Sequence, residues 1–173
     1  VIYTDEVEIN NFKIKNGSVL YMEEASLQLE GDLANFSIRR TDFGKSGFGN
    51  ALWYVEFQAD SLNETFTTTT TLYLNNQNQD FEKQLQNDIF LQHLIKTDVI
   101  TTVLSSILLS EDDYQFDLSA EYPDDSLGKI ISDWLSSLNV RKDSDLKNIT
   151  NQIINEQGIF RRRCQNLASS KEE

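Results

Sequence analysis

The sequence predicts an α+β fold, in which an antiparallel sheet packs against a set of helices. Apolar residues alternate with polar ones through most of residues 1–75, which is typical of half-buried strands. We expect about six strands there, arranged as an antiparallel β-meander. Over residues 79–160 the apolar spacing becomes helical and predicts roughly three or four helices. We interpret residues 1–173 as a single α+β domain, with a candidate subdomain seam at 75–79.

The strand segments are marked by their alternation and by the turn residues between them. The Asn-Gly pair at positions 16–17 predicts a two-residue hairpin turn. In the stretch ALWYVEF, the side chains of Trp53, Val55 and Phe57 fall on one face of a strand. The run Thr67–Thr71 is β-branched throughout, so we expect it to continue a half-exposed strand.

Helical spacing begins in the segment QDFEKQLQNDIFLQHLIK, which predicts an amphipathic helix. Thr97 and Asp98 can cap a second helical segment, VITTVLSSILL, which follows directly. The acidic segment EDDYQFDLSAEY then alternates again, and we expect it to return as a strand.

The clearest helix lies in the segment DSLGKIISDWLSSL, with Asp125 or Ser126 as its cap. Its side chains predict a continuous apolar stripe that packs in the core. The stripe consists of Leu127, Ile130, Ile131, Trp134, Leu135 and Leu138. A further helix in SDLKNITNQIINEQG is expected to end at Gly158, and residues 165–173 are expected to fray.

The chain is acidic, with a net charge of −13, and the charge is unevenly spread. Residues 1–120 carry 7 basic and 19 acidic side chains, so their net charge is −12. An acidic surface repels phosphate backbones, and we expect no direct nucleic-acid binding by this region. No apolar run is long enough to span a membrane. The single cysteine, Cys164, excludes an intrachain disulfide and suits a reducing, intracellular compartment.

The triplet Gly44-Lys45-Ser46 matches the end of a phosphate-binding loop. Such a loop also requires a glycine five positions earlier, where this chain has Arg39, and a helix afterwards. The following residues alternate as a strand does, so we interpret the triplet as a connector. The same loop carries Phe43 and Phe48, which either fold back over the core or contact a partner protein, and we include both as candidate contacts.

Catalytic and metal-binding patterns are weak in this sequence. His93 is the only histidine, and no second imidazole stands at ligand spacing. The carboxylates of Glu111, Asp112, Asp113 and Asp117 are clustered, but they lack the spacing and the turn glycine of an EF-hand. We predict no catalytic, cofactor-binding or metal-ligating residue, and therefore no enzyme and no cofactor.

Arg161, Arg162 and Arg163 form the one basic cluster of the chain, directly before Cys164. Neighbouring guanidinium groups can lower the pKa of a thiol, but no second Cys or His assists Cys164, so we expect a free, partly buried thiol. The cluster either neutralises the protein's own acidic surface or contacts an acidic partner. We therefore include all three arginines among the candidate partner contacts.

These observations predict a non-catalytic, acidic protein-interaction module that acts as a subunit or adaptor of a larger assembly. Its partner is expected to be another protein, with a basic surface that complements the acidic chain. Two alternatives stay open. The chain can be an acidic nucleic-acid mimic that inhibits a nucleic-acid-binding enzyme, which requires carboxylates in rows along one face. It can also carry a small apolar ligand, which requires an enclosed apolar pocket.

Overall fold

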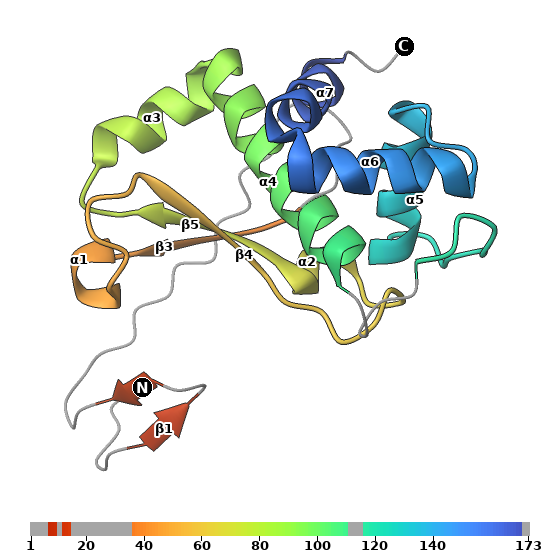
Figure 1. Ribbon diagram of the computed structural model, residues 1–173. Helices are drawn as coiled ribbons and strands as arrows, with labels where there is room; N and C mark the ends of the chain where they lie inside the picture. The colour runs from red at the N-terminus through yellow and green to blue at the C-terminus, as the bar shows by residue number, and fades with distance from the viewer. Residues whose placement is uncertain (1–6, 10–11, 15–35, 111–115, 171–173) are drawn as a thin grey trace.

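The computed structural model describes residues 7–9, 12–14, 36–110 and 116–170, and Figure 1 shows their arrangement. The described chain is a mixed α+β structure in which a small sheet packs on one side against helices. A separate two-stranded pair is formed by β1 (Val7–Ile9) and β2 (Phe12–Ile14). Its strands are antiparallel, and Val7 lies opposite Ile14. The predicted hairpin turn at 16–17 falls outside the described residues.

The main sheet has three strands in the order β3, β5, β4. They are β3 (Ser37–Thr41), β4 (Trp53–Phe57) and β5 (Thr70–Asn75). The central strand β5 pairs in parallel with β3 and antiparallel with β4. The predicted antiparallel meander of about six strands is therefore wrong. Alternation indicates which face a side chain occupies, but it does not indicate which strand lies beside it or in which direction.

The threonine run was also predicted wrongly, because it is divided between a helical turn and a strand. Phe66–Thr69 forms the short helix α2, and β5 begins only at Thr70. The hydroxyl of Thr68 donates to the carbonyl of Thr65 at 2.7 Å, and that of Thr69 donates to the carbonyl of Phe66 at 3.0 Å. Such local bonds from threonine to the backbone stabilise a turn in competition with the sheet ladder.

The predicted amphipathic helix is broken at Asp88 into α3 (Gln79–Asn87) and α4 (Ile89–Leu109). Asp88 ends the first helix and caps the second, because its Oδ1 accepts from the backbone N–H of Phe90 at 2.9 Å and of Leu91 at 3.3 Å. No new helix starts at Thr97 or Asp98, since α4 continues through both residues.

Seven helices occur in the described part of the chain, more than the predicted three or four. The additional ones include α1 (Phe43–Ser46), α2 and the last helix. After α4, residues 116–122 contain no strand, and 111–115 lie outside the described residues. The remaining helices are α5 (Leu127–Ser137), α6 (Asp143–Asn155) and α7 (Gln157–Ser169). Gly158 does not end a helix but lies inside α7.

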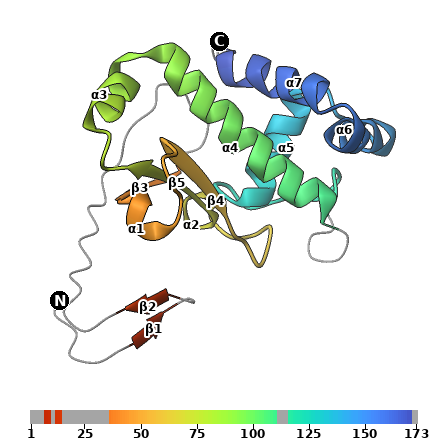
Figure 2. The same cartoon turned by 60° about the vertical axis from the view of Figure 1, so that its left-hand side comes forward.

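The long helix α4 forms the centre of the core, between the sheet and the C-terminal helices (Figures 1 and 2). It contributes the largest set of buried side chains, and it packs against α7 on the side away from the sheet. The predicted stripe on α5 is buried apart from Ile130, which is half-buried. Trp134 meets Phe66 edge to face, with ring centroids 5.5 Å apart. None of the described helices is long and apolar enough to cross a bilayer.

Candidate functional site

The sheet has two chemically different faces, because successive side chains of a strand point to opposite sides. Trp53 and Val55 lie on the face toward α4, where the Trp53 indole bonds to Asp98 of that helix. The opposite face, which we call the open face, carries Tyr54 and Glu56 from β4. Tyr73 lies directly between Tyr54 on one side and Arg39 of β3 on the other, as the strand register requires.

A group of apolar side chains lies on the open face, and we call it the aromatic face. It consists of Phe48, Leu52, Tyr54 and Tyr73. Phe48 stacks on Tyr54 with ring centroids 4.7 Å apart, and Tyr73 lies 6.3 Å from each of these two rings. Leu52 and Tyr54 remain 38% and 40% exposed. Large apolar side chains this accessible on a rigid sheet are available for contact with another molecule.

Two glycines allow the loop before β4 to place Phe48 over the sheet. Gly47 ends α1 in the left-handed region, with φ of 82°, and the N–H of Phe48 then bonds back to the carbonyl of Phe43 at 3.1 Å. Gly49 also has a positive φ, 64°. A side chain at either position would be strained. The glycine cluster thus has a conformational role in presenting Phe48.

The open face mixes opposite charges. The hydroxyl of Tyr73 donates a hydrogen bond of 2.9 Å to Oε2 of Glu56. Burial raises the pKa of Tyr73, the Glu56 carboxylate raises it further, and Arg39 opposes both effects. Tyr73 therefore stays a neutral hydrogen-bond donor at neutral pH. With Arg39 and Glu56 on either side of it, the face can recognise both acidic and basic groups of a partner.

The triplet Gly44-Lys45-Ser46 lies inside the single turn of α1, and a strand follows it. Asp42 caps this turn, and its Oδ2 lies 3.3 Å from Nζ of Lys45. The hydroxyl of Ser46 donates to the carbonyl of Asp42 at 3.0 Å. A phosphate group beside Lys45 would meet the Asp42 carboxylate, which agrees with the interpretation of this triplet as a connector.

The five candidate contact residues differ in exposure and in hydrogen bonding. Phe43 is fully buried, with 0% exposure, so a partner has no access to it. Phe48 is half-buried within the aromatic face. Arg163 donates to Oε1 of Gln152 at 3.1 Å and to the carbonyl of Leu138, and so connects α7 to α6 and to the end of α5. These bonds stabilise the packing of α7.

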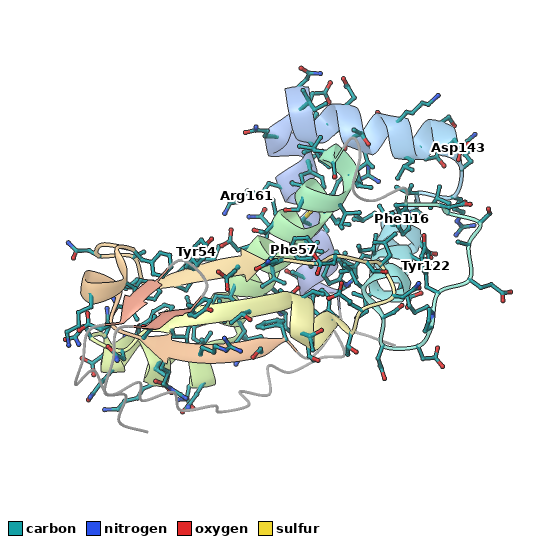
Figure 3. All side chains as sticks on the ribbon, turned by 90° about the horizontal axis from the view of Figure 1, so that it is seen from below. Tyr54, Phe57, Phe116, Tyr122, Asp143 and Arg161 are labelled. Carbon is teal, nitrogen blue, oxygen red and sulfur yellow. The ribbon has the colours of Figure 1, made fainter. Side chains whose placement is uncertain are left out.

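Arg161 and Arg162 are both exposed, and Figure 3 labels Arg161 at the outside of α7. Arg162 lines an open hollow of about 500 Å³ at the junction of α6 and α7, together with Ile159 and Glu156. A similar hollow of about 520 Å³ lies at the start of α6 and contains Asp143, which Figure 3 also labels. Both hollows are lined mainly by charged and polar residues.

Leu52, Tyr54 and Tyr73 were not predicted from the sequence as surface residues. Their positions relative to Trp53 and Leu74 were a usable signal, because residues of opposite parity on a strand face opposite sides. A second exposed apolar group, at the start of α4, was missed as well. There Phe90 is 80% exposed beside Ile89 and Leu94.

The described residues contain no group of three or more His, Cys, Asp or Glu side chains that could hold a metal ion. Asp117 accepts bonds from Ser119 N at 2.8 Å and from Ser119 Oγ at 2.7 Å, which lowers its pKa. This carboxylate thus stabilises a local turn. Glu111, Asp112 and Asp113 lie outside the described residues.

Cys164 is buried, and burial raises the pKa of its thiol to about 11, although the charges of Arg163 and Arg161 act in the opposite direction. The neighbouring arginines therefore do not activate it. His93 is half-buried on α4, and its backbone carbonyl accepts from the hydroxyl of Thr97 at 2.7 Å.

Comparison of the chain with protein-family models, curated proteins and solved structures finds no match in any of the three. The feature with the clearest physical meaning is the aromatic face, where partly exposed aromatic rings lie between charges of opposite sign.

Proposed function

We propose that the chain is a non-catalytic protein-interaction module, a subunit or adaptor of a larger assembly, and that it binds its partner through the aromatic face. The observation that supports this most directly is the stack of Phe48 on Tyr54 beside exposed Leu52. Aromatic side chains held in place before binding lose little conformational entropy, and such residues dominate the binding energy of many interfaces.

The surroundings of the aromatic face favour a protein as the partner. Arg39 and Glu56 lie on the two outer strands, so a partner with charges of both signs is oriented as it docks. The hydroxyl groups of Tyr54 and Tyr73 add polar groups to an apolar surface. This combination of aromatic centre and polar surroundings is typical of protein interfaces.

The two alternatives receive less support from the described residues. A nucleic-acid mimic needs rows of carboxylates, whereas β3 carries two arginines, β4 carries one glutamate and β5 carries no acidic residue. A carrier of apolar ligands needs an enclosed apolar cavity, and neither of the two hollows near α6 is one, because both are open and lined mainly by charged and polar residues.

Site-specific photo-crosslinking tests the proposal. p-Benzoyl-phenylalanine is placed at Tyr54 in one variant and at Ile159 in a control variant, because both side chains are 40% exposed. After irradiation in a lysate of the native host, mass spectrometry identifies the adducts. We expect the Tyr54 variant to capture discrete proteins that the Ile159 variant does not.

The proposal fails if position 54 gives no protein adduct, or if both positions give the same set. Adducts between two copies of this chain are scored separately. With a captured partner, Phe48→Ala should accelerate dissociation by about tenfold or more, because the stack that holds Tyr54 is lost.

A further inference from the structure

Strand β4 lies at an edge of the sheet. Figure 3 shows β5 between β4 and β3, with Tyr54 and Phe57 labelled on β4. Among the described residues no strand pairs with the other side of β4. An unpaired edge of this kind presents a row of backbone donors and acceptors to any chain that can align with it.

The hydrogen bonds at both ends of the β4–β5 ladder show which residues of β4 have backbone N–H and C=O groups that point away from β5. The N–H of Asn75 donates to the carbonyl of Leu52 at 3.0 Å, and the N–H of Gln58 donates to the carbonyl of Thr69 at 2.9 Å. Hydrogen-bonded pairs alternate with non-bonded pairs along an antiparallel ladder. The backbone N–H and C=O groups of the even-numbered residues of β4 therefore point toward β5.

The backbone N–H and C=O groups of Trp53, Val55 and Phe57 therefore point away from the sheet. No hydrogen bond to these outward groups is made within the described part of the chain. A strand edge with unpaired donors and acceptors can accept a further strand, which would satisfy these backbone groups.

We propose that this further strand is β4 of a second copy, paired antiparallel around a two-fold axis at Val55. Val55 then lies opposite Val55 of the second copy, and Trp53 lies opposite Phe57. These are all outward-facing positions, so the three pairs can form six backbone hydrogen bonds. The inference goes beyond the proposed function, because it concerns the strand edge and not the open face.

The side chains of β4 are complementary to themselves in this register. On the face toward the helices, Trp53, Val55 and Phe57 meet one another, so apolar groups contact apolar groups. On the open face, Tyr54 lies opposite Glu56 of the second copy, whose carboxylate can accept from the phenol hydroxyl. The two Glu56 carboxylates do not face each other, which avoids direct repulsion across the axis.

The overall charge predicts how this dimer responds to salt. Each copy carries a net charge of −13, so two copies repel each other at long range. Backbone pairing and apolar contact are not screened, whereas the repulsion has a range of only about 3 Å at 1 M salt. Raising the salt concentration should therefore strengthen the dimer. Association through opposite charges would show the reverse.

Sedimentation equilibrium at about 0.05 M and about 0.5 M salt tests the inference with four proteins: the unaltered chain, Tyr54→Asp, Tyr54→Lys, and the double variant Tyr54→Asp with Glu56→Lys. Tyr54→Asp places like charges opposite each other twice, so we expect the dimer to weaken by about tenfold. Tyr54→Lys should strengthen it, since the introduced ammonium group would face Glu56 of the second copy. The double variant should restore dimerisation, because the carboxylate introduced at position 54 would face the ammonium group introduced at position 56.

Gln165→Glu on α7 is the control, since it adds one negative charge at an exposed position away from β4. A circular dichroism spectrum equal to that of the unaltered chain shows that each variant is folded. The inference is overturned if the unaltered chain stays monomeric at both salt concentrations, or if its dimer does not respond to Tyr54→Asp. A monomer that still captures host proteins through position 54 would leave the proposed function intact.

Discussion

The indole Nε1 of Trp53 donates a hydrogen bond of 3.0 Å to Oδ2 of Asp98. The same ring stacks on Phe81 with centroids 5.6 Å apart. One side chain thus attaches the edge strand β4 to both α3 and α4. The apolar body of tryptophan packs while its N–H finds an acceptor, which is how a half-buried indole is usually satisfied.

We predict that Trp53→Phe lowers the free energy of unfolding by about 1–2 kcal/mol, through lost packing area and a lost hydrogen bond to a charged group. A double-mutant cycle with Asp98→Ala isolates the bond, and urea denaturation measures each variant. The coupling energy should be about 1 kcal/mol. Asp98→Asn keeps an acceptor and should cost less. Additive single effects would show that the bond contributes nothing.

Trp134 on α5 is the second tryptophan to test. It is buried against Phe66, so Trp134→Ala removes a large core side chain and should cost about 3–5 kcal/mol. Chemical denaturation measures the change. A loss below about 1 kcal/mol is typical of a tolerated surface substitution and would contradict the core assignment of the α5 stripe.

The parts of the fold that the sequence predicts correctly depend on local periodicity. The inward side chains of β4 and the stripe on α5 follow from spacing alone, because the geometry of one strand or one helix determines which residues share a face. The same reasoning, continued to the opposite face of β4, would have identified Tyr54 as an exposed residue.

The parts predicted wrongly depend on contacts between distant segments or on side-chain bonds to the backbone. The parallel pairing of β3 with β5 brings together strands that are separated by α1, β4 and α2. The break at Asp88 is a capping bond inside a continuous apolar pattern. Burial of Phe43 and the bonds of Arg163 likewise depend on tertiary packing, which one sequence does not reveal.

Lys45 provides a test of the phosphate-loop motif. Because its ion pair with Asp42 is exposed to solvent, with the Lys45 side chain 85% exposed, we expect Lys45→Ala to leave stability unchanged within about 0.5 kcal/mol. Calorimetric titration of the unaltered chain with ATP or GTP and magnesium should give no heat. A dissociation constant in the micromolar range that Lys45→Ala abolishes would contradict the connector interpretation.

Gly128 and Gly158 form a matched pair of helical glycines. A Cβ at Gly128 would lie 2.2 Å from Cδ1 of Tyr122, whose ring stacks on Phe116. Gly128→Ala should therefore displace Tyr122 and cost about 1–3 kcal/mol. Nothing lies within 4 Å of a Cβ at Gly158, so Gly158→Ala should stabilise α7 by up to about 1 kcal/mol. The midpoint of thermal unfolding should fall for Gly128→Ala and rise for Gly158→Ala. Equal shifts in the two variants would contradict the role of Tyr122.

The thiol of Cys164 predicts a specific loss of stability at alkaline pH. Burial raises its pKa from the ordinary 9.0 to about 11 in the folded chain. At pH values below the pKa of the unfolded thiol, the thiol is protonated in both the folded and the unfolded chain, so its contribution to the free energy of unfolding is fully present. As pH rises from 9.0 toward about 11, the unfolded thiol ionises first and stability is lost.

A pKa difference of two units corresponds to about 2.7 kcal/mol. Between pH 8 and pH 11 the unaltered chain should therefore lose about 2–3 kcal/mol more stability than Cys164→Ala. Denaturation at several pH values measures both, and the tyrosine and lysine titrations that the two proteins share cancel in the difference. Because the thiolate is the reactive form, iodoacetamide should label Cys164 at pH 8 only after unfolding. Parallel stability curves, or rapid labelling of the folded protein, would show that the thiol is neither desolvated nor protected.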